Sequence, residues 1–231
     1  MAYGIGGVSR PAHHSTIVCM YSPSQFAETR IETLHALIRA HPLGTLITFG
    51  EAGLEANHIP FEVHPDPAPF GTLRAHVARA NSVWRDFSAD VGALVVFQGP
   101  SAYITPSWYA TKRDTGKVVP TYNYAVVHAS GPMRAIEDRV WLRALVGRLT
   151  DRFEAPRSEP WQVGDAPADF IDNLLGAIVG LEIPLALLVG KWKMSQNRPA
   201  ADIGSIVDGL LETQGADAVE VAKLVEARNR R

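Results

Sequence analysis

The feature that most constrains the fold is the order of the strand-like segments, because most of them follow one another without an intervening helix. Residues 71–79 alternate between apolar and polar side chains, which predicts a half-buried strand. Residues 93–97 are apolar at every position, which predicts a central strand covered on both faces. Residues 101–105 are expected to continue this strand past Gly99-Pro100, and further strands are expected at residues 45–49, 54–63, 121–130 and 178–189. Short links between such segments are typical of an antiparallel barrel, so the sequence predicts a mainly β fold with peripheral helices and not a doubly wound parallel sheet.

Helices are expected at the ends of the chain and in a few links. The run Ser22-Pro23-Ser24-Gln25 has the form of a capping box with proline at the first helical position, and apolar residues at helical spacing follow it. A helix is therefore predicted from Ser22 to just before Pro42. Other helices are expected at residues 81–87, 137–152, 170–175, 200–211 and 216–226, and a polar loop is expected at residues 106–120.

Composition places the chain among globular proteins. It has 231 residues, of which 46% are hydrophobic and 20% charged, so it can bury a core. The net charge of -2 excludes a polybasic protein, and contact with nucleic acid would need a local basic patch. The single cysteine, Cys19, excludes an internal disulfide and a cysteine-based zinc site, and it favours a cytoplasmic, reducing location.

The sequence predicts neither a membrane span nor a signal peptide. The most apolar stretch, residues 174–190, contains Glu182 and Pro184 and therefore predicts a buried strand. The first residues lack a basic region followed by an apolar run. We expect three parts: a flexible N-terminal extension at residues 1–19, a barrel domain at residues 20–199 and a helical tail at residues 200–231.

Three polar clusters lie at the predicted ends of strands, while the common dinucleotide, Walker, nucleophile-elbow and metalloprotease motifs are absent. In the first cluster, Asn57 and His58 interrupt a strand-like segment. The second cluster lies where a strand meets a short helix and contains Arg74, His76, Arg79, Asn81 and Trp84. The third cluster follows the most apolar segment and contains Lys191, Trp192, Lys193, Ser195, Gln196, Asn197 and Arg198.

The second and third clusters offer the donors that an anion such as phosphate needs. Guanidinium groups bind phosphate through paired hydrogen bonds, and amide and backbone N–H groups at a helix start add further donors. Each cluster also has a plain structural interpretation. The first fits a polar strand end, the second a solvated strand-helix corner, and the third a basic turn with a helix cap.

Two aromatic segments lie between these clusters, at residues 103–109 and 119–124. Their tyrosine and tryptophan rings could stack against a flat heteroaromatic ligand. A loop packed by its own aromatic side chains is the alternative.

Six ordered motifs together resemble the PaiB-like proteins, a family described as FMN-binding negative transcriptional regulators. They are Met20-Tyr21-Ser22-Pro23, Asn57-His58-Ile59-Pro60, His76-Val77-Ala78-Arg79-Ala80-Asn81, the stretch from Gly99-Pro100 to Tyr109, the stretch from Val119 to Tyr124, and the stretch from Lys191 to Asn197. The resemblance runs from Met20 to about Asp202. Two positions depart from the family pattern, since Tyr122 stands where tryptophan is expected and Ala110 where proline is common.

The resemblance implies a split antiparallel β-barrel related to the pyridoxamine-phosphate-oxidase-like flavin-binding group. It implies a homodimer with FMN in a cleft at the subunit interface. By similarity, the FMN phosphate would lie near Arg79 and Asn81, with His58 and His76 nearby, and Asn57 is also expected to bind the cofactor. The isoalloxazine would lie near Thr121, Asn123 and Tyr124, and the cleft would be closed by Lys191, Lys193, Ser195, Gln196 and Asn197.

Three functions follow from this resemblance and stay open at this point. The first is an FMN-binding regulator of transcription, although the chain has no helix-turn-helix signature and its net charge of -2 does not favour direct DNA binding. The second is a flavin-dependent oxidoreductase or flavin reductase acting on a small molecule. The third is a haem-binding split barrel, which would need a histidine in the cleft. The sequence assigns no catalytic residue and no metal site.

Overall fold

The computed structural model describes residues 20–230 and is built on two antiparallel sheets. The larger sheet has the order β1-β10-β7-β6-β2-β3. Its strands are β1 (Ala27–Glu28), β2 (Leu43–Gly50), β3 (Gly53–Pro60), β6 (Ala93–Ile104), β7 (Thr121–Gly131) and β10 (Leu187–Lys193). The smaller sheet has the order β4-β5-β9-β8, with β4 (Glu62–His64), β5 (Thr72–Ala78), β8 (Arg134–Ile136) and β9 (Ile178–Pro184). The mainly β, antiparallel prediction is confirmed.

Short links, two of which the sequence prediction missed, pass from one sheet to the other and close the barrel between them. After β3 the chain turns at Phe61 into β4, and the buried Phe61 ring packs edge-on against Phe97 with 5.7 Å between ring centroids. After β9 the chain turns at Leu185 and Ala186 into β10, where Ala186 N–H donates to the carbonyl of Ser130. The single strands predicted at residues 54–63 and 178–189 are therefore wrong, since each segment contains two strands of different sheets.

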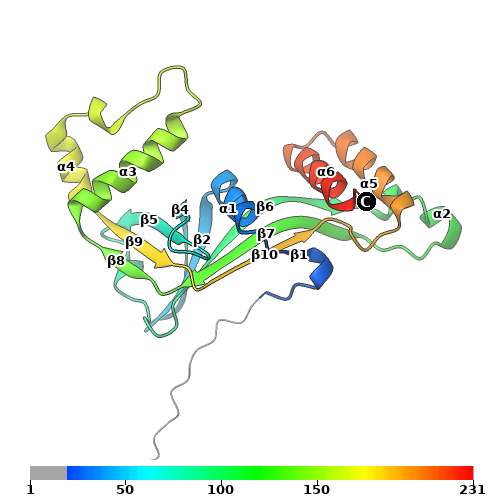
Figure 1. Cartoon of the computed structure of the whole chain (residues 1–231), viewed down its shortest axis with the longest axis horizontal. Coiled ribbons are helices and arrows are strands. Elements are labelled where there is room, and N and C mark those ends of the chain that lie inside the picture. Colours follow the sequence, from blue (N-terminus) through cyan, green and yellow to red (C-terminus); the bar gives the residue numbers. More distant parts are fainter. Residues whose placement is uncertain (1–19, 231) are drawn as a thin grey trace, which may run out of the picture.

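The helices lie at the two ends of the barrel and beside it (Figure 1). The α-helices are α1 (Ile31–Ala40), α2 (Lys112–Thr115), α3 (Arg139–Glu154), α4 (Ala168–Gly176), α5 (Ala200–Glu212) and α6 (Ala216–Asn229). One-turn 3-10 helices occur at η1 (Ser24–Phe26), η2 (Ser82–Trp84), η3 (Pro106–Trp108) and η4 (Val163–Asp165). Figure 1 shows α3 and α4 at one end of the molecule and α5 and α6 at the other. Among residues 20–230, no helix has the length and apolar character that a membrane crossing requires.

The helix predicted from Ser22 begins at Ile31 instead. The Ser22 hydroxyl is buried without a hydrogen-bond partner, and η1 has no side-chain cap. The next residues form β1, in which Ala27 pairs with Lys191 and Glu28 with Gly190. Pairing with the edge of the sheet outweighs the local capping pattern, so helix α1 starts nine residues later than predicted.

The loop predicted at residues 106–120 and the helix predicted at residues 81–87 also differ in detail. The loop contains η3 and the four-residue helix α2, and the second segment forms only the single turn η2. The other predicted helices are confirmed within a few residues at each end, including the two C-terminal helices, which pack against β6 and each other.

The core fills the space between the sheets, while the opposite face of the larger sheet stays partly open. Leu46, Val95 and Phe97 point into the core and are fully buried. Their neighbours Leu94 and Val96 point to the other face and are only partly buried. The central place of residues 93–97 is confirmed, because β6 lies between β7 and β2. The prediction that this strand is covered on both faces is not met within one chain.

Candidate cofactor site

The first group of predicted site residues lies where β3, at the edge of the larger sheet, approaches β5 of the smaller sheet. Asn81 caps η2, since its side-chain oxygen accepts from the Val83 N–H at 2.9 Å. Its Nδ2 donates to Asn57 Oδ1 at 2.8 Å, and Asn57 Nδ2 donates to Glu55 Oε1 at 2.8 Å. The structure therefore brings Asn57 and Asn81 into direct contact, although the sequence prediction places Asn57 in a strand and Asn81 at the start of a separate helix.

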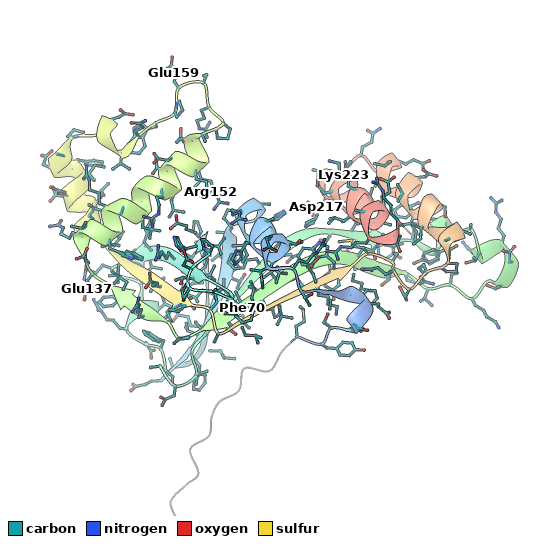
Figure 2. All side chains as sticks on the ribbon, viewed as in Figure 1. Phe70, Glu137, Arg152, Glu159, Asp217 and Lys223 are labelled. Atoms are coloured by element: carbon teal, nitrogen blue, oxygen red, sulfur yellow. The ribbon has the colours of Figure 1, made fainter. Side chains whose placement is uncertain are left out.

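Arg79 follows β5 and fastens two neighbouring segments together. Its Nε donates to the carbonyl of Gly176 at 2.9 Å, its Nη2 to the carbonyl of Ile178 at 3.2 Å, and its Nη1 forms an ion pair with Glu137. Glu137 lies at the end of the molecule that carries α3 and α4 (Figure 2). Each of the three guanidinium nitrogens of Arg79 makes one bond to these groups, which leaves two of its five N–H donors for another acceptor such as a phosphate.

His76 and His58 lie on different sheets and do not share one environment. His76 stands opposite Gly180 in β9, and the Trp141 ring of α3 packs so closely on Gly180 that a side chain there would collide with it. Burial lowers the pKa of His76, and its Nδ1 is buried without a hydrogen-bond partner. His58 is exposed on β3 and faces the opposite side of the sheet from Asn57, because successive residues of a strand alternate.

The second group lies near the far ends of β7 and β10. Lys191 and Lys193 stand opposite Val126 and Tyr124, and both lysines face the partly open side of the larger sheet. The Lys191 Nζ donates to the Tyr21 carbonyl at 2.9 Å and lies 5.5 Å from the ring centroids of both Tyr21 and Tyr124. The Lys193 Nζ donates to the Thr121 hydroxyl.

Asn123 lies on the other side of the same sheet, away from Tyr124. It is fully buried and its Nδ2 donates to the Ser195 Oγ at 2.9 Å. Ser195 has a φ of 61°, a left-handed conformation in which this buried bond holds it. Gln196 accepts from the Met194 N–H and donates to the Trp192 carbonyl, while Asn197 is exposed. These residues shape the turn after β10 and do not join the lysine group.

The two groups do not meet within one chain. Three strands, β7, β6 and β2, lie between β10 and β3. The prediction from the sequence also missed residues that contact each group in the structure. Glu55 and Glu137 contact the first group, and the Tyr21 ring and carbonyl contact the second. Tyr21 lies in the first of the six motifs, and that motif could have identified it as a site residue. Nothing near Glu137 in the sequence indicated that it contacts Arg79.

The first group has chemistry that fits a flavin phosphate. Asn57 and Asn81 offer amide donors, and His76, opposite Gly180 in β9, has one buried nitrogen without a hydrogen-bond partner. The second group offers flat tyrosine rings beside two ammonium groups, which suits a flat anionic ligand. Among residues 20–230, no three histidine, cysteine, aspartate or glutamate side chains are grouped so that they could hold a metal ion.

Comparisons with known proteins agree with this chemistry. Residues 20–186 match the family described as "Putative FMN-binding domain". The chain is 30% identical to the protease synthase and sporulation protein PAI 2 of Bacillus subtilis over 207 residues, covering 90% of this chain and 97% of that protein. It is 34% identical to an uncharacterized protein of Emericella nidulans over 245 residues, again covering 90% of this chain and 97% of the relative.

Solved structures with the same fold include an FAD- and haem-binding protein and a flavocytochrome. The FAD and heme binding protein of Mycobacterium smegmatis is 18% identical, with a TM-score of 0.55, and the match covers 82% of this chain and 80% of that one. The flavocytochrome Anf3 of Azotobacter vinelandii is 14% identical, with a TM-score of 0.52, and the match covers 72% and 69%. These likenesses show that the chain shares the fold of these two proteins. The chain therefore belongs to the PaiB-like family of FMN-binding domain proteins.

Proposed function

We propose that two copies of this chain form a dimer that holds FMN at its interface, and that this flavoprotein works in the cytoplasm. The observation that carries the proposal is the partly open face of the larger sheet. Strand register places ten residues in two rows on that face: Leu187, Ser130, Leu94, Ile47 and Ala56 in one, and Val189, His128, Val96, Thr45 and His58 in the other. Most of these side chains are apolar, whereas a sheet face that meets water carries mainly polar residues.

The exposed apolar residues at the edge of this face support the same proposal. Leu54 is 79% exposed and Phe49 is 45% exposed, and these two residues are directly paired between β2 and β3. A continuous apolar surface of this kind marks a contact surface. A second copy is a suitable occupant because a two-fold dimer covers the same face on both subunits.

In this dimer the two groups of site residues play different parts. We assign the phosphate end of FMN to the first group, with Asn57, Asn81 and His76 as donors and Arg79 as the residue that fixes the strand end. The ring would lie across the interface, near Thr121 and Tyr124 of the other subunit. Phosphate oxygens accept hydrogen bonds from both charged and neutral donors, and a flavin ring packs against a flat surface. When bound, FMN would supply the capacity to accept and donate electrons.

A flavin titration of variants tests the phosphate assignment. Asn81→Ala removes one donor and the cap of η2, and we expect FMN to bind at least about tenfold more weakly while riboflavin, which has no phosphate, changes little. The matched control is Asn197→Ala, which removes an exposed amide from the turn after β10. Equal FMN affinity for the folded Asn81→Ala variant and the wild type would move the phosphate away from the first group.

Regulation of transcription is the family description of PaiB-like proteins, and we propose that any such role here does not depend on direct DNA binding. The net charge of -2 supports this, since DNA contact relies on clustered positive charge. The test is a gel-shift titration at low salt with and without FMN. Retarded DNA at micromolar protein would contradict it.

The alternative function is a flavin-dependent oxidoreductase. The two lysines of the second group favour it, because the first group binds the cofactor in this proposal and the lysines can then bind another ligand. Oxidation of NADH or NADPH by the FMN-loaded protein would support this function. The absorbance spectrum of the purified protein separates both flavin proposals from a haem protein, because a haem gives an intense Soret band.

A further inference from the structure

Lys191 is a buried lysine without an acidic partner. Its side chain is only 8% exposed, and its Nζ contacts a single carbonyl and the faces of two tyrosine rings. Lysine is rarely buried unless an opposite charge accompanies it, because burial removes the water that stabilises the ammonium group. Among residues 20–230, the only lysine ion pair joins Glu220 to Lys223, which Figure 2 labels, and both residues lie on helix α6. Residues 1–19 contain no aspartate or glutamate.

A second ammonium group lies beside the first. Lys193 is two residues further along β10 on the same face, and its Nζ is held by the Thr121 hydroxyl. Burial lowers the pKa of Lys193, and the positive charges of Lys191 and Arg198 lower it too, against an opposing effect of Tyr124. Two partly buried cations on one strand repel each other, so an anion between them would relieve both the repulsion and the lost hydration.

The side chains around Lys191 are mainly flat tyrosine rings. Tyr124 and Tyr21 flank Lys191, and Tyr122 continues the same face of β7 with its ring packed edge-on against Tyr103 at 5.8 Å. Tyr122 and Tyr103 are about half exposed. Tyrosine rings present flat apolar surface that favours stacking with another ring. Paired cations on a tyrosine floor therefore suit a small planar anion.

We propose that Lys191 and Lys193 bind the carboxylate or phosphate of a small planar substrate that lies against Tyr21 and Tyr124. The position of this substrate beside FMN rests on the proposed dimer, in which the other subunit closes the open side of the site. The anion site itself does not depend on FMN, so the two proposals can fail separately.

The test is calorimetric titration of the protein, with and without FMN, using three probes. Benzoate and phenyl phosphate carry the two candidate anionic groups on a flat ring, and benzamide is the neutral counterpart of benzoate. We expect at least one anionic probe to bind about tenfold or more tightly than benzamide. The stronger of the two anions identifies the group that the substrate carries. Equal binding of benzoate, phenyl phosphate and benzamide, or no binding of any of them, overturns the proposal.

Variants assign the effect to the lysines. Lys191→Met keeps the length of the side chain and removes the charge, and we expect it to weaken the preferred anion about tenfold while FMN affinity and dimer mass stay unchanged. Lys191→Arg should retain most of the binding, and Lys223→Met is the matched control on an exposed lysine. If folded Lys191→Met loses FMN binding, Lys191 binds the cofactor and not a separate substrate. If the variant loses the dimer, Lys191 pairs with a carboxylate of the other subunit. Either result overturns the proposal, and Lys193→Met repeats the test if Lys191→Met does not fold.

Discussion

Glu28 is a buried carboxylate whose charge is stabilised by two arginines. It is 4% exposed, it accepts from Arg30 Nη2 at 2.7 Å, and it forms a second ion pair with Arg228 of α6. Burial by itself would raise the pKa of Glu28, but the hydrogen bonds from Arg30 and Arg228 lower it to about 2. The residue therefore connects the edge strand β1 to the last helix.

The pH dependence of stability follows from this pair. The folded pKa of Glu28 lies below the unfolded value, so the pair stabilises the fold above about pH 4.5 and this contribution is lost as the pH falls toward 2. We expect Glu28→Gln to lower the free energy of unfolding at pH 7 by about 2–4 kcal/mol and to have a much smaller effect at pH 2. The control is Glu220→Gln, in an exposed pair with Lys223, with an expected change below about 0.5 kcal/mol. Urea unfolding at both pH values measures this, and equal stability of the two variants at pH 7 would contradict it.

At the residue scale the sequence identified polar clusters but not their partners. Asn57 and Asn81 were both named from their motifs, and the structure places them in contact. Asn123 was named with Tyr124, yet the two face opposite sides of β7. The alternation of a strand was readable in the sequence, but which side faced the core depended on contacts with distant segments such as α6. The engagement of Arg79 with Glu137 and two carbonyls was likewise a long-range result.

At the element scale, strands and helices were predictable where the pattern was long and regular. Helix α3 and strands β5 and β7 were found in this way, and each is held mainly by its own apolar face. The breaks at Phe61 and Leu185 were missed, because an apolar run looks the same whether it continues one strand or passes into a second sheet. The wrong helix start at Ser22 had a different cause. The local capping pattern was present, but pairing of β1 with β10 overrode it.

The start of helix α3 offers a local test of such a cap. Asp138 accepts from the Trp141 N–H at 2.7 Å, and α3 covers the outer face of the smaller sheet through Trp141. We expect Asp138→Ala to lower the free energy of unfolding by about 1 kcal/mol. Asp151→Ala, at an exposed position in the body of the same helix, should change it by less than about 0.5 kcal/mol. Chemical denaturation of both variants measures the difference, and indistinguishable midpoints would argue against a stabilising cap.

At the scale of the whole molecule, the partly open sheet face is the feature that links the fold to the proposed function. Val96 lies near the centre of this face, between His128 and Thr45 in register. We expect Val96→Glu to convert the dimer to a monomer, because a carboxylate there would lose its water on association without gaining a partner. Val140→Glu, at a position 79% exposed on α3, should leave the dimer intact. Light scattering reads the mass of each variant, and a dimeric Val96→Glu protein would place the interface elsewhere.

The fold class and the family were predictable from the sequence, but the separation of the site into two groups was not. The six motifs follow one another along the chain, and order in the sequence carries no information on how β3 and β10 are spaced in the sheet. In the proposed dimer the two groups form one site only when two copies meet, so the proposed site belongs to the assembly.

Native mass spectrometry of the protein mixed with FMN tests the central claim most directly. The account predicts a species of about 50 kDa, twice the 25.1 kDa of one chain, that retains two FMN molecules and exchanges them poorly for riboflavin. A 25.1 kDa species that carries FMN, or a dimer that carries none at saturating FMN, would contradict it.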